Sequence, residues 1–244
     1  MSKPRWEYIY GINPAFEVVR SGRRELYGAF LNKKAMDHPR LKKLNTLLQR
    51  KNVPVEWVEK GRVFDLAQSK EHQGVVLKTS PYVYASFEPL LERERLLLLD
   101  NIEDPHNVGA VIRCADVFGY NTVLLPLKGT PEVYPSIVKV SAGATEHLDI
   151  AKETSANNYV KKTIEHGYKI VALDMKGTTT FHALRLEKID KVMLVIGGEA
   201  TAVGQFILNH ADYTVRIHQH GKINSLNASV AAGIAMFMLG TQDT

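Results

Sequence analysis

Apolar and polar positions along the chain follow two different periods, and stretches with each period alternate. Apolar residues at every second position, or in short unbroken runs, are typical of strands, whereas spacings of three and four are typical of helices. In the first third of the chain the pattern predicts strands at 26–31, 53–58 and 74–77 and helices at 14–21, 37–50 and 63–68. Further along it predicts strands at 96–99, 122–125, 169–174, 192–196 and 213–217. Helices at 108–118, 136–143, 156–166 and 202–209, and a last one that opens at Ser225-Leu226-Asn227, complete the series.

This order of elements divides the chain into two regions. The first is a compact α/β mixture, in which Asn13 is expected to cap a helix before Pro14 and Gly22 to end it. In the second, near-continuous apolar strands alternate with helices, which predicts a parallel sheet covered on both faces. Prolines and serines between the regions indicate a linker. We therefore expect a basic α/β domain at 1–80, a linker at 81–94 and a second domain at 95–244.

Charge is distributed unevenly between these domains. The chain has a formal net charge of +5, yet residues 1–80 contain 16 Lys and Arg against 8 Asp and Glu, so the remainder is slightly acidic. The helix at 37–50 places its leucines on one face and its basic side chains mostly off that face. The leucines are Leu41, Leu44, Leu47 and Leu48, and the basic residues are Arg40, Lys42, Lys43 and Arg50. The first domain is thus a candidate for binding RNA or DNA, with a merely solubilising surface as the alternative.

The sequence argues against several classes of protein. No apolar run approaches the roughly 18 residues of a membrane span, and the N-terminus lacks the apolar core of a signal peptide. A single cysteine, Cys114, cannot form an internal disulfide, so we expect a cytoplasmic protein. The second domain has no G-x-G-x-x-G after its first strand, and the chain has no P-loop. His218 and His220 have no third ligand nearby in sequence, so no metal site is expected.

Polar residues gather where strands of the second domain end, which is the edge at which open α/β sheets bind ligands. Asn107 belongs to the loop after the first of these strands, and its purely structural alternative is a helix N-cap. Arg113, two turns into a helix of small apolar residues, either reaches solvent or faces an anion. Glu199 follows two glycines at a strand end, where it also suits the N-terminus of the next helix. Ser225 and Asn227 open the last helix, and one of them is expected to cap it.

Three sequence stretches carry a resemblance to a known family. DNIEDPHNVGAVIRCADVFGYN, VIGGEATAVGQ and RIHQHGKINSLNASVAAGIA resemble, in order and spacing, the three motifs of SpoU/TrmH-type RNA 2′-O-ribose methyltransferases of the SPOUT class. The resemblance covers residues of about 95–240. The first third, with GINPAFEVV and HQGVVL, is similar to the small substrate-binding domain of some members. Similar in length and layout are bacterial enzymes that methylate a guanosine ribose of 23S ribosomal RNA.

The resemblance implies a fold, a cofactor and an assembly. The implied fold is a parallel-sheet domain with a trefoil knot, preceded by a small RNA-binding α/β domain. The implied cofactor is S-adenosylmethionine, lined mainly by backbone groups of Gly197, Ile217 and Leu226. The implied assembly is a homodimer, and the small residues of the last helix permit close packing there or in the core of one chain. The catalytic residues that the resemblance implies are Asn107, Arg113, Glu199, Ser225 and Asn227.

The same resemblance leaves three functional hypotheses open. The first is methyl transfer to a ribose 2′-hydroxyl of 23S ribosomal RNA, in which Arg113 contacts a phosphate and stabilises the developing alkoxide, since a guanidinium hardly deprotonates. The second is the same reaction on transfer RNA. The third is a catalytically silent RNA-binding or ribosome-assembly protein of the same fold. The separate basic domain favours ribosomal RNA, but only by resemblance.

The chain departs from the family pattern around the implied cofactor site. Members usually read Gly-Glu-Gly-x-Gly in the second motif, whereas here Ala200 and Ala202 stand at the two later glycine positions. An alanine there would cost about 1 kcal/mol or more if its position required a positive φ. His218 and Gln219 stand where the third motif usually has Pro-Met. Loss of that proline is expected to loosen the rim of the pocket and to weaken cofactor binding.

Overall fold

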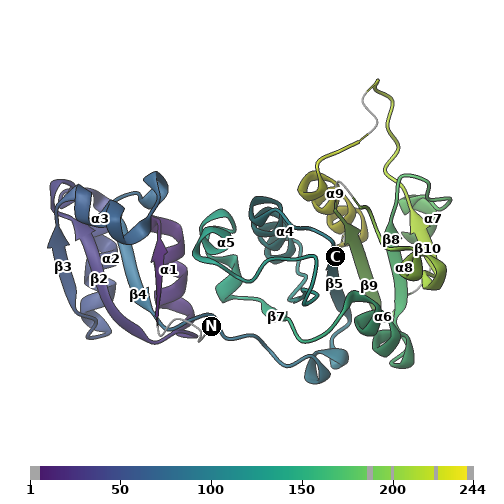
Figure 1. Cartoon of the computed structure of the whole chain (residues 1–244), viewed down its shortest axis with the longest axis horizontal. Coiled ribbons are helices and arrows are strands. Elements are labelled where there is room, and N and C mark those ends of the chain that lie inside the picture. Colours follow the sequence, from purple (N-terminus) through teal and green to yellow (C-terminus); the bar gives the residue numbers. More distant parts are fainter. Residues whose placement is uncertain (1–5, 186–188, 199–200, 223–224, 241–244) are drawn as a thin grey trace. The chain divides into compact units, whose positions relative to one another are not determined.

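The computed structural model describes residues 6–185, 189–198, 201–222 and 225–240 of the chain (Figure 1). The chain divides into two compact units. The first unit contains residues 1–83 together with 133–147, and the second contains 84–132 together with 148–244. Among the described residues, no helix is long and apolar enough to cross a membrane.

The first unit is a four-stranded sheet with helices packed against it. Its strands and helices are β1 (Glu7–Tyr10), α1 (Ile12–Ser21), β2 (Leu26–Asn32), α2 (Pro39–Arg50), β3 (Val55–Val58), α3 (Lys60–Ala67), β4 (Val75–Thr79) and α5 (Pro135–Val140). Three single-turn 3-10 helices, η1 (Lys33–Ala35), η2 (Lys70–His72) and η4 (Ala144–Glu146), lie between them. The strand order is β1-β4-β2-β3, with β4 antiparallel to both of its neighbours and β2 parallel to β3.

Two helices of this unit, α1 and α2, can be compared with what the sequence predicted for them. Gly22, with φ of 67°, ends α1 as predicted, but Asn13 does not cap that helix. The residue before α1 is Gly11, the Ile12 amide donates to Gln73 Oε1 (3.0 Å), and the Asn13 side chain accepts from Arg40 instead (2.6 Å). In α2 the side chains of Leu41, Leu44 and Leu48 are buried and the basic ones are exposed, which confirms its predicted amphipathic character.

A buried ion pair explains why residues 133–147 belong to the first unit. The Arg24 guanidinium donates to the Glu146 carboxylate through Nη2 (3.0 Å) and through Nε (3.1 Å). Its Nη1 donates to Glu7 (2.7 Å). The side chains of Arg24 and Glu146 are 1% and 0% exposed. The predicted second domain, 95–244, includes residues 133–147, because the partners of this pair lie far apart along the chain and leave no local signal in the sequence.

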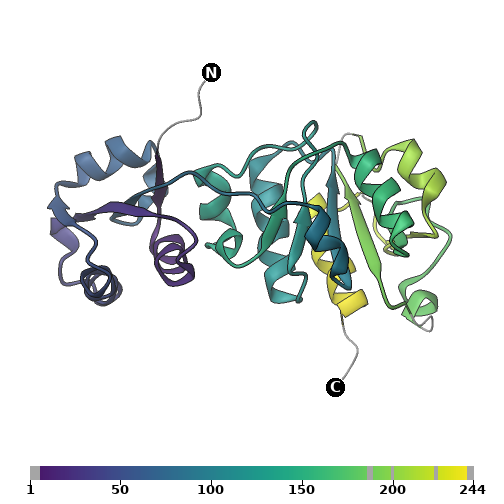
Figure 2. The same cartoon turned by 90° about the horizontal axis from the view of Figure 1, so that it is seen from below.

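The second unit is an α/β layer structure around a parallel sheet. Its strands are β5 (Arg95–Asp100), β6 (Thr122–Leu124), β7 (Asp149–Ala151), β8 (Lys169–Leu173), β9 (Val192–Gly197) and β10 (Tyr213–Val215). Its helices are η3 (Glu88–Glu92), α4 (Pro105–Val117), α6 (Ala156–Glu165), α7 (Phe181–Arg185), α8 (Gln205–His210) and α9 (Ala228–Gly240). The strand order is β10-β8-β9-β5-β6-β7, and neighbouring strands pair in parallel, which confirms the predicted sheet (Figure 2).

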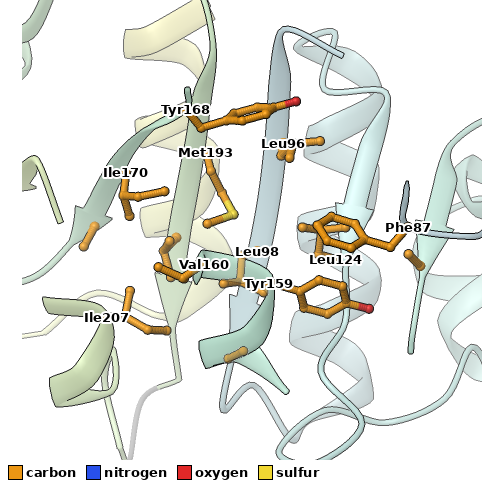
Figure 3. Close-up of a cluster of buried hydrophobic side chains, with 14 of the residues drawn as sticks. Phe87, Leu96, Leu98, Leu124, Tyr159, Val160, Tyr168, Ile170, Met193 and Ile207 are labelled. Carbon is orange, nitrogen blue, oxygen red and sulfur yellow. The ribbon is translucent and has the colours of Figure 1, made fainter. Parts of the chain in front are cut away.

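Both faces of this sheet are covered. Leu96 and Leu98 point to one face, where they join a cluster built from α6, α8 and neighbouring strands (Figure 3). Tyr159 lies in this cluster with its ring 4.7 Å from that of Phe87, edge to face. Leu97 and Leu99 are also fully buried, and alternation along the strand directs them to the opposite face. The helices α4 and α9 pack on each other and α9 contacts β9.

Candidate active site

Asp100, the last residue of β5, forms hydrogen bonds with the segment that follows β9. The Asp100 carbonyl accepts from the Gly198 amide (2.9 Å), and its Oδ2 accepts from the Gly204 amide (2.8 Å). Asp100 is only 5% exposed, and this burial raises the pKa of its carboxyl, with the Gly204 hydrogen bond acting in the opposite direction. Asp100 is not among the site residues predicted from the sequence. The signal for it was a carboxylate that directly ends the apolar run LLLLD.

The two glycines at the end of β9, Gly197 and Gly198, are required by the packing of the chain itself. A methyl group at Gly198 would overlap the Asn101 carbonyl, and one at Gly197 would overlap the backbone of residues 202 and 203. The Ala202 amide donates to the Gly198 carbonyl (2.9 Å), so the chain turns back on itself directly after the strand. Gly197 is therefore needed here whatever ligand binds nearby. Glu199 and Ala200 lie outside the described residues.

Ala202 stands where the family usually has a glycine, and its backbone has a positive φ. Its φ is 48°, in the left-handed region that favours glycine. An L-residue in this conformation costs roughly 1–2 kcal/mol relative to glycine. The alanine therefore strains the turn between β9 and α8 at the position where the family usually has its last glycine.

The loop after β6 reaches the same edge of the sheet. Gly129 has a φ of 82°, and a methyl group there would lie 2.7 Å from Asn101 Oδ1. Lys152 Nζ holds this loop by donating to the Pro126 carbonyl (2.6 Å), the Thr130 carbonyl (2.9 Å) and Thr130 Oγ1 (3.1 Å). Burial lowers the pKa of Lys152, with Glu132 acting in the opposite direction. Asn101 thus lies between the loop after β6 and Gly198, which follows β9.

Helix α4 begins earlier than the sequence pattern predicted. Asp104 is its N-cap and accepts from the His106 amide (2.9 Å), while Pro105 takes the first helical position. The interpretation of Asn107 as an N-cap is therefore wrong. Asn107 lies within the first turn, and its Oδ1 accepts a hydrogen bond from Asn227 Nδ2 (2.9 Å).

Asn227 holds the start of α9. Its Oδ1 accepts from the Ser229 amide (3.0 Å) and from Ser229 Oγ (2.6 Å), so of the two residues expected to cap this helix it is Asn227 that does so. Because the oxygen faces α9, the amide nitrogen faces Asn107. The N-termini of two helices that are 120 residues apart in sequence are thereby joined at one point.

Arg113 lies on α4 with an exposed side chain. Its guanidinium thus reaches solvent, the first of the two predicted alternatives, and is in no ion pair recorded for the described part of the chain. Contact of Arg113 with an anion stays a prediction. Its neighbour Cys114 is half-buried, 3.4 Å from where a Cβ on Gly233 would lie. Burial raises the pKa of the Cys114 thiol against the influence of Arg113, so Cys114 is poorly suited to act as a nucleophile.

The remaining predicted residues lie on the segment that follows β10 (Figure 1). Ile217 is half-buried, whereas Ser225 and Leu226 are exposed. Within the described ranges, no hydrogen bond joins Gly197 to Ile217 or Leu226. The structure therefore brings Asn107 and Asn227 together but does not join the three predicted cofactor residues. The described residues also contain no group of three His, Cys, Asp or Glu side chains that could hold a metal ion.

The fold and this site together define an α/β protein with a cluster of polar residues at the carboxyl edge of a parallel sheet, which is where open α/β sheets bind ligands. The chain belongs to the SpoU rRNA methylase family, whose model matches residues 94–237. Residues 8–85 match the substrate-binding domain of RNA 2′-O ribose methyltransferases. The predicted class of enzyme, an RNA 2′-O-ribose methyltransferase, is confirmed at the level of the family.

Known proteins are similar to this chain over nearly its whole length. YacO of Bacillus subtilis (strain 168), named provisionally as a TrmH family tRNA/rRNA methyltransferase, is 28% identical over 95% of this chain and 94% of its own. A solved RNA 2′-O ribose methyltransferase superposes with a TM-score of 0.83 at 22% identity, covering 96% of this chain and 88% of that one. The AdoMet-bound rRNA methyltransferase from Sinorhizobium meliloti superposes with a TM-score of 0.78 at 20% identity, covering 96% and 87%.

Proposed function

We propose that this protein transfers a methyl group from S-adenosylmethionine to a ribose 2′-hydroxyl in RNA, on a guanosine of 23S ribosomal RNA. The observation that carries the proposal is the hydrogen bond between Asn107 and Asn227, which joins the first and third family motifs at the sheet edge. Ribosomal RNA is favoured over transfer RNA because the chain has the separate basic unit. It is also favoured because a similar two-unit structure is titled an rRNA methyltransferase. The trefoil knot implied by the resemblance stays a prediction.

The residues near the sheet edge fit S-adenosylmethionine in chemical character. The Leu226 side chain is large and apolar yet 36% exposed, directly beside the polar Asn227, and Ile217 is half-buried on the same segment. Apolar side chains that leave backbone groups accessible suit an adenosine group, and we propose Gly197, Ile217 and Leu226 as the residues that hold it. When bound, this cofactor supplies an electrophilic methyl group.

The protein side chains then have to orient and stabilise the RNA. The hydrogen bond between Asn107 and Asn227 joins the N-termini of α4 and α9, whose positive dipole ends favour an anionic group nearby. Arg113 projects its guanidinium from α4 into solvent, so it is suited to hold an RNA phosphate and to stabilise negative charge developing on the 2′-oxygen. Ser225 and Glu199 are proposed to complete the site.

Substitution of Arg113 tests this assignment. Arg113→Ala is expected to leave the fold and cofactor affinity unchanged while methyl transfer falls by about two orders of magnitude or more, because a charge-stabilising donor is lost. The matched control is Asp116→Ala, which removes another exposed charge from the same helix. Transfer would be measured with radiolabelled S-adenosylmethionine and ribosomal RNA. Near-normal turnover by Arg113→Ala would remove this residue from the mechanism.

Cofactor binding separates the enzyme from the catalytically silent alternative. Calorimetric titration with S-adenosylmethionine is expected to give measurable heat, and the ligand is expected to raise the melting temperature. Absence of both would favour a silent RNA-binding or ribosome-assembly protein. Comparison of ribosomal and transfer RNA as methyl acceptors would then separate the two enzymatic alternatives.

The first unit is proposed to bind the RNA through its basic surface. Helix α2 exposes Lys43 and Arg50, and neither is in an ion pair recorded for the described residues, whereas Lys42 pairs with Asp37 (2.9 Å). Each phosphate contact contributes roughly 0.7–0.9 to the slope of log affinity against log salt. Lys43→Gln with Arg50→Gln is therefore expected to weaken RNA binding and to flatten the salt dependence.

Lys161→Gln with Lys176→Gln, which removes two exposed cations of the second unit, is the control for that experiment. An unchanged salt slope in the α2 variant would contradict the division of labour between the units. Deletion of residues 1–80 is a poor substitute, because it would remove Arg24 and leave the fully buried Glu146 without its partner.

A homodimer is proposed to form on the groove between α4 and α9. This apolar groove has a volume of about 480 Å³, and its lining includes Cys114, Phe118, Val230, Gly233, Ile234 and Phe237. The buried residues of α9 are Ala228, Ala232, Ala235 and Met236, whereas Val230 and Phe237 are about half exposed. The small residues Ala228, Ala232 and Ala235 thus serve the core of one chain, whereas Gly233 lines the groove. The exposed apolar residues favour a second copy.

Sedimentation of charged variants tests this assembly. Phe237→Asp is expected to convert the dimer into a monomer, because it places a charge in the apolar contact. Met175→Asp is the control, since Met175 is also a highly exposed apolar residue of the second unit but lies outside the groove. A wild-type protein that sediments as a monomer at micromolar concentration would contradict the proposal.

A further inference from the structure

One face of the sheet in the first unit is covered only in part. Helix α3 packs on this face, whereas α1 and α2 pack on the other (Figure 2). The buried cluster beneath α3 contains Tyr10 and Val76, which pair across β1 and β4. Two residues further along these strands, Tyr8 pairs with Lys78. Because alternate residues of a strand share a face, Tyr8 and Lys78 lie on the α3 side of the sheet, at the margin of that cluster.

Trp6 extends this uncovered part of the face. It precedes Tyr8 by two residues, and its side chain is 42% exposed. The Lys78 ammonium lies over the indole ring, 4.0 Å from its centroid, in a cation–π contact. A tryptophan that is fixed on one side by a lysine and open to solvent elsewhere offers a large flat contact area. Trp6, Tyr8 and Lys78 are called the Trp6 patch below.

The charge of the Trp6 patch is positive and is not neutralised nearby. Lys78 is in no ion pair recorded for the described residues. Glu7, which lies between Trp6 and Tyr8 in sequence, alternates to the other face and pairs with Arg24 (2.7 Å). The exposed Glu56 belongs to β3, which is separated from β4 by β2. A free cation beside exposed aromatic rings favours a polyanion that also carries flat groups, which is the chemistry of a nucleic acid.

We propose that the Trp6 patch stacks an unpaired base of the RNA and that Lys78 contacts the phosphate beside that base. This inference rests on the proposed function for the identity of the ligand, and it adds a preference for single-stranded segments. Because Lys78 occupies one face of the indole, the base stacks on the opposite face. Bases within a duplex are stacked on one another and cannot reach the ring. The exposed cations of α2 lie on the other side of the sheet and are suited to phosphates alone.

The two tryptophans of the chain allow stacking to be observed directly. Trp57 precedes Val58, a member of the cluster beneath α3, so alternation directs Trp57 to the side of α1 and α2. Trp57→Phe leaves Trp6 as the only tryptophan, and Trp6→Phe leaves Trp57 as the matched control. Each variant of the full chain would be titrated with a short mixed-sequence single-stranded RNA and with the duplex of the same sequence, and its tryptophan fluorescence recorded.

Single-stranded RNA is expected to quench the fluorescence of Trp57→Phe, because a base stacks on its remaining indole. The duplex is expected to quench it much less, and Trp6→Phe is expected to change little with either RNA. Trp6 fluorescence that stays unchanged while single-stranded RNA binds would overturn the proposal, as would equal quenching by the duplex. A change with protein concentration in the absence of RNA would assign the patch to a second copy of the chain and overturn the proposal too.

Affinities separate stacking from charge. Trp6→Ala is expected to bind single-stranded RNA about tenfold more weakly, whereas Trp6→Phe, which keeps a flat ring, retains most of the affinity. Lys78→Gln is expected to lower the slope of log affinity against log salt by roughly 0.7, because one phosphate contact is lost. Phe64→Ala is the control, since it removes another exposed aromatic ring of the first unit (41% exposed). Unchanged affinity in Trp6→Ala, or an equal loss in Phe64→Ala, would overturn the proposal.

Assays of the wild-type protein distinguish this failure from failure of the proposed function. A wild-type protein that binds neither RNA nor S-adenosylmethionine contradicts the methyltransferase proposal, and the role of the Trp6 patch falls with it. A wild-type protein that methylates RNA, beside a Trp57→Phe variant whose fluorescence RNA does not quench, contradicts only the role of the patch. Melting temperatures measured without RNA would confirm that each variant is folded.

Discussion

At the scale of single residues, the alanine at position 202, where the family usually has glycine, is expected to lower the stability of the fold. Ala202→Gly is expected to raise the free energy of unfolding by about 1 kcal/mol, because glycine adopts its φ of 48° without steric cost. Urea unfolding of the two proteins measures this difference. Thr201→Gly is the control, since Thr201 is not among the positive-φ residues and its replacement is expected to give no gain. A destabilised Ala202→Gly variant would contradict the assignment of strain.

The buried carboxylate of Asp100 gives a second prediction at this scale. Its folded pKa is raised above the ordinary value of 3.8, so between these two values the native state binds more protons than the unfolded state. At pH 7 the ionised Asp100 carboxylate therefore lowers the free energy of unfolding. This loss becomes smaller as the pH falls through the raised pKa. Asp100→Asn keeps an oxygen for the Gly204 amide and removes the charge, so it is expected to be more stable than the wild type at pH 7.

Urea unfolding at pH 7 and at pH 4 measures this effect. The advantage of Asp100→Asn is expected to be smaller at pH 4 than at pH 7, because the pKa of the wild-type carboxyl is raised and its charged form is less populated as the pH falls. Asp116→Asn, which changes an exposed carboxylate of α4, is the control and is expected to show no advantage at pH 7. An Asp100→Asn variant that is less stable than the wild type at pH 7 would show that the ionised form is favoured by its surroundings.

At the scale of elements, the ion pair between Arg24 and Glu146 links residues 133–147 to the rest of the first unit. Arg24→Met is expected to cost about 3–5 kcal/mol, because it leaves a fully buried carboxylate without its partner. Arg24→Met with Glu146→Met is expected to recover much of this loss. Both tryptophans, Trp6 and Trp57, lie in the first unit, so their fluorescence during urea unfolding reports on this unit directly.

The matched control is the exposed pair of Arg93 and Asp149, whose atoms lie 3.2 Å apart. Arg93→Met is expected to change the free energy of unfolding by only about 0–1 kcal/mol. Equal effects of Arg24→Met and Arg93→Met would contradict the importance of burial for the first pair.

The elements also show which features the sequence could predict. The apolar runs of β5, β8 and β9 were placed to within one or two residues, because strands buried on both faces leave a strong pattern. The strands β1 and β7 and the helix α7 were missed, since each is at most five residues long and carries little periodicity. The start of α4 was misplaced because Asp104 caps ahead of Pro105, a signal that the sequence did contain.

The candidate site was predictable in its residues but not in its geometry. The polar residues at strand ends and the family motifs singled out Asn107 and Asn227, yet the hydrogen bond between them follows from tertiary packing over 120 residues. The same holds for Asn101, whose place between Gly129 and Gly198 has no local signature. Long-range contacts of this kind lie beyond what periodicity or propensity can indicate.

At the scale of the whole molecule, the proposed account assigns RNA binding to the basic first unit and methyl transfer to the sheet edge of the second. The product of this reaction is a 2′-O-methylated ribose. Exposed cations of the first unit are proposed to hold the RNA phosphates, and the second unit is proposed to hold both the cofactor and the target ribose. Ribose 2′-O-methylation leaves the base unchanged, so the product is detected only by a method that reads the sugar.

The most direct measurement is a map of ribose methylation in total RNA from cells with the gene, without it, and with the Arg113→Ala variant. The account predicts a 2′-O-methylated guanosine of 23S ribosomal RNA that is present with the wild-type gene and absent in the other two. Identical maps in all three would contradict methyl transfer by this protein, and a site lost from transfer RNA alone would contradict the ribosomal target.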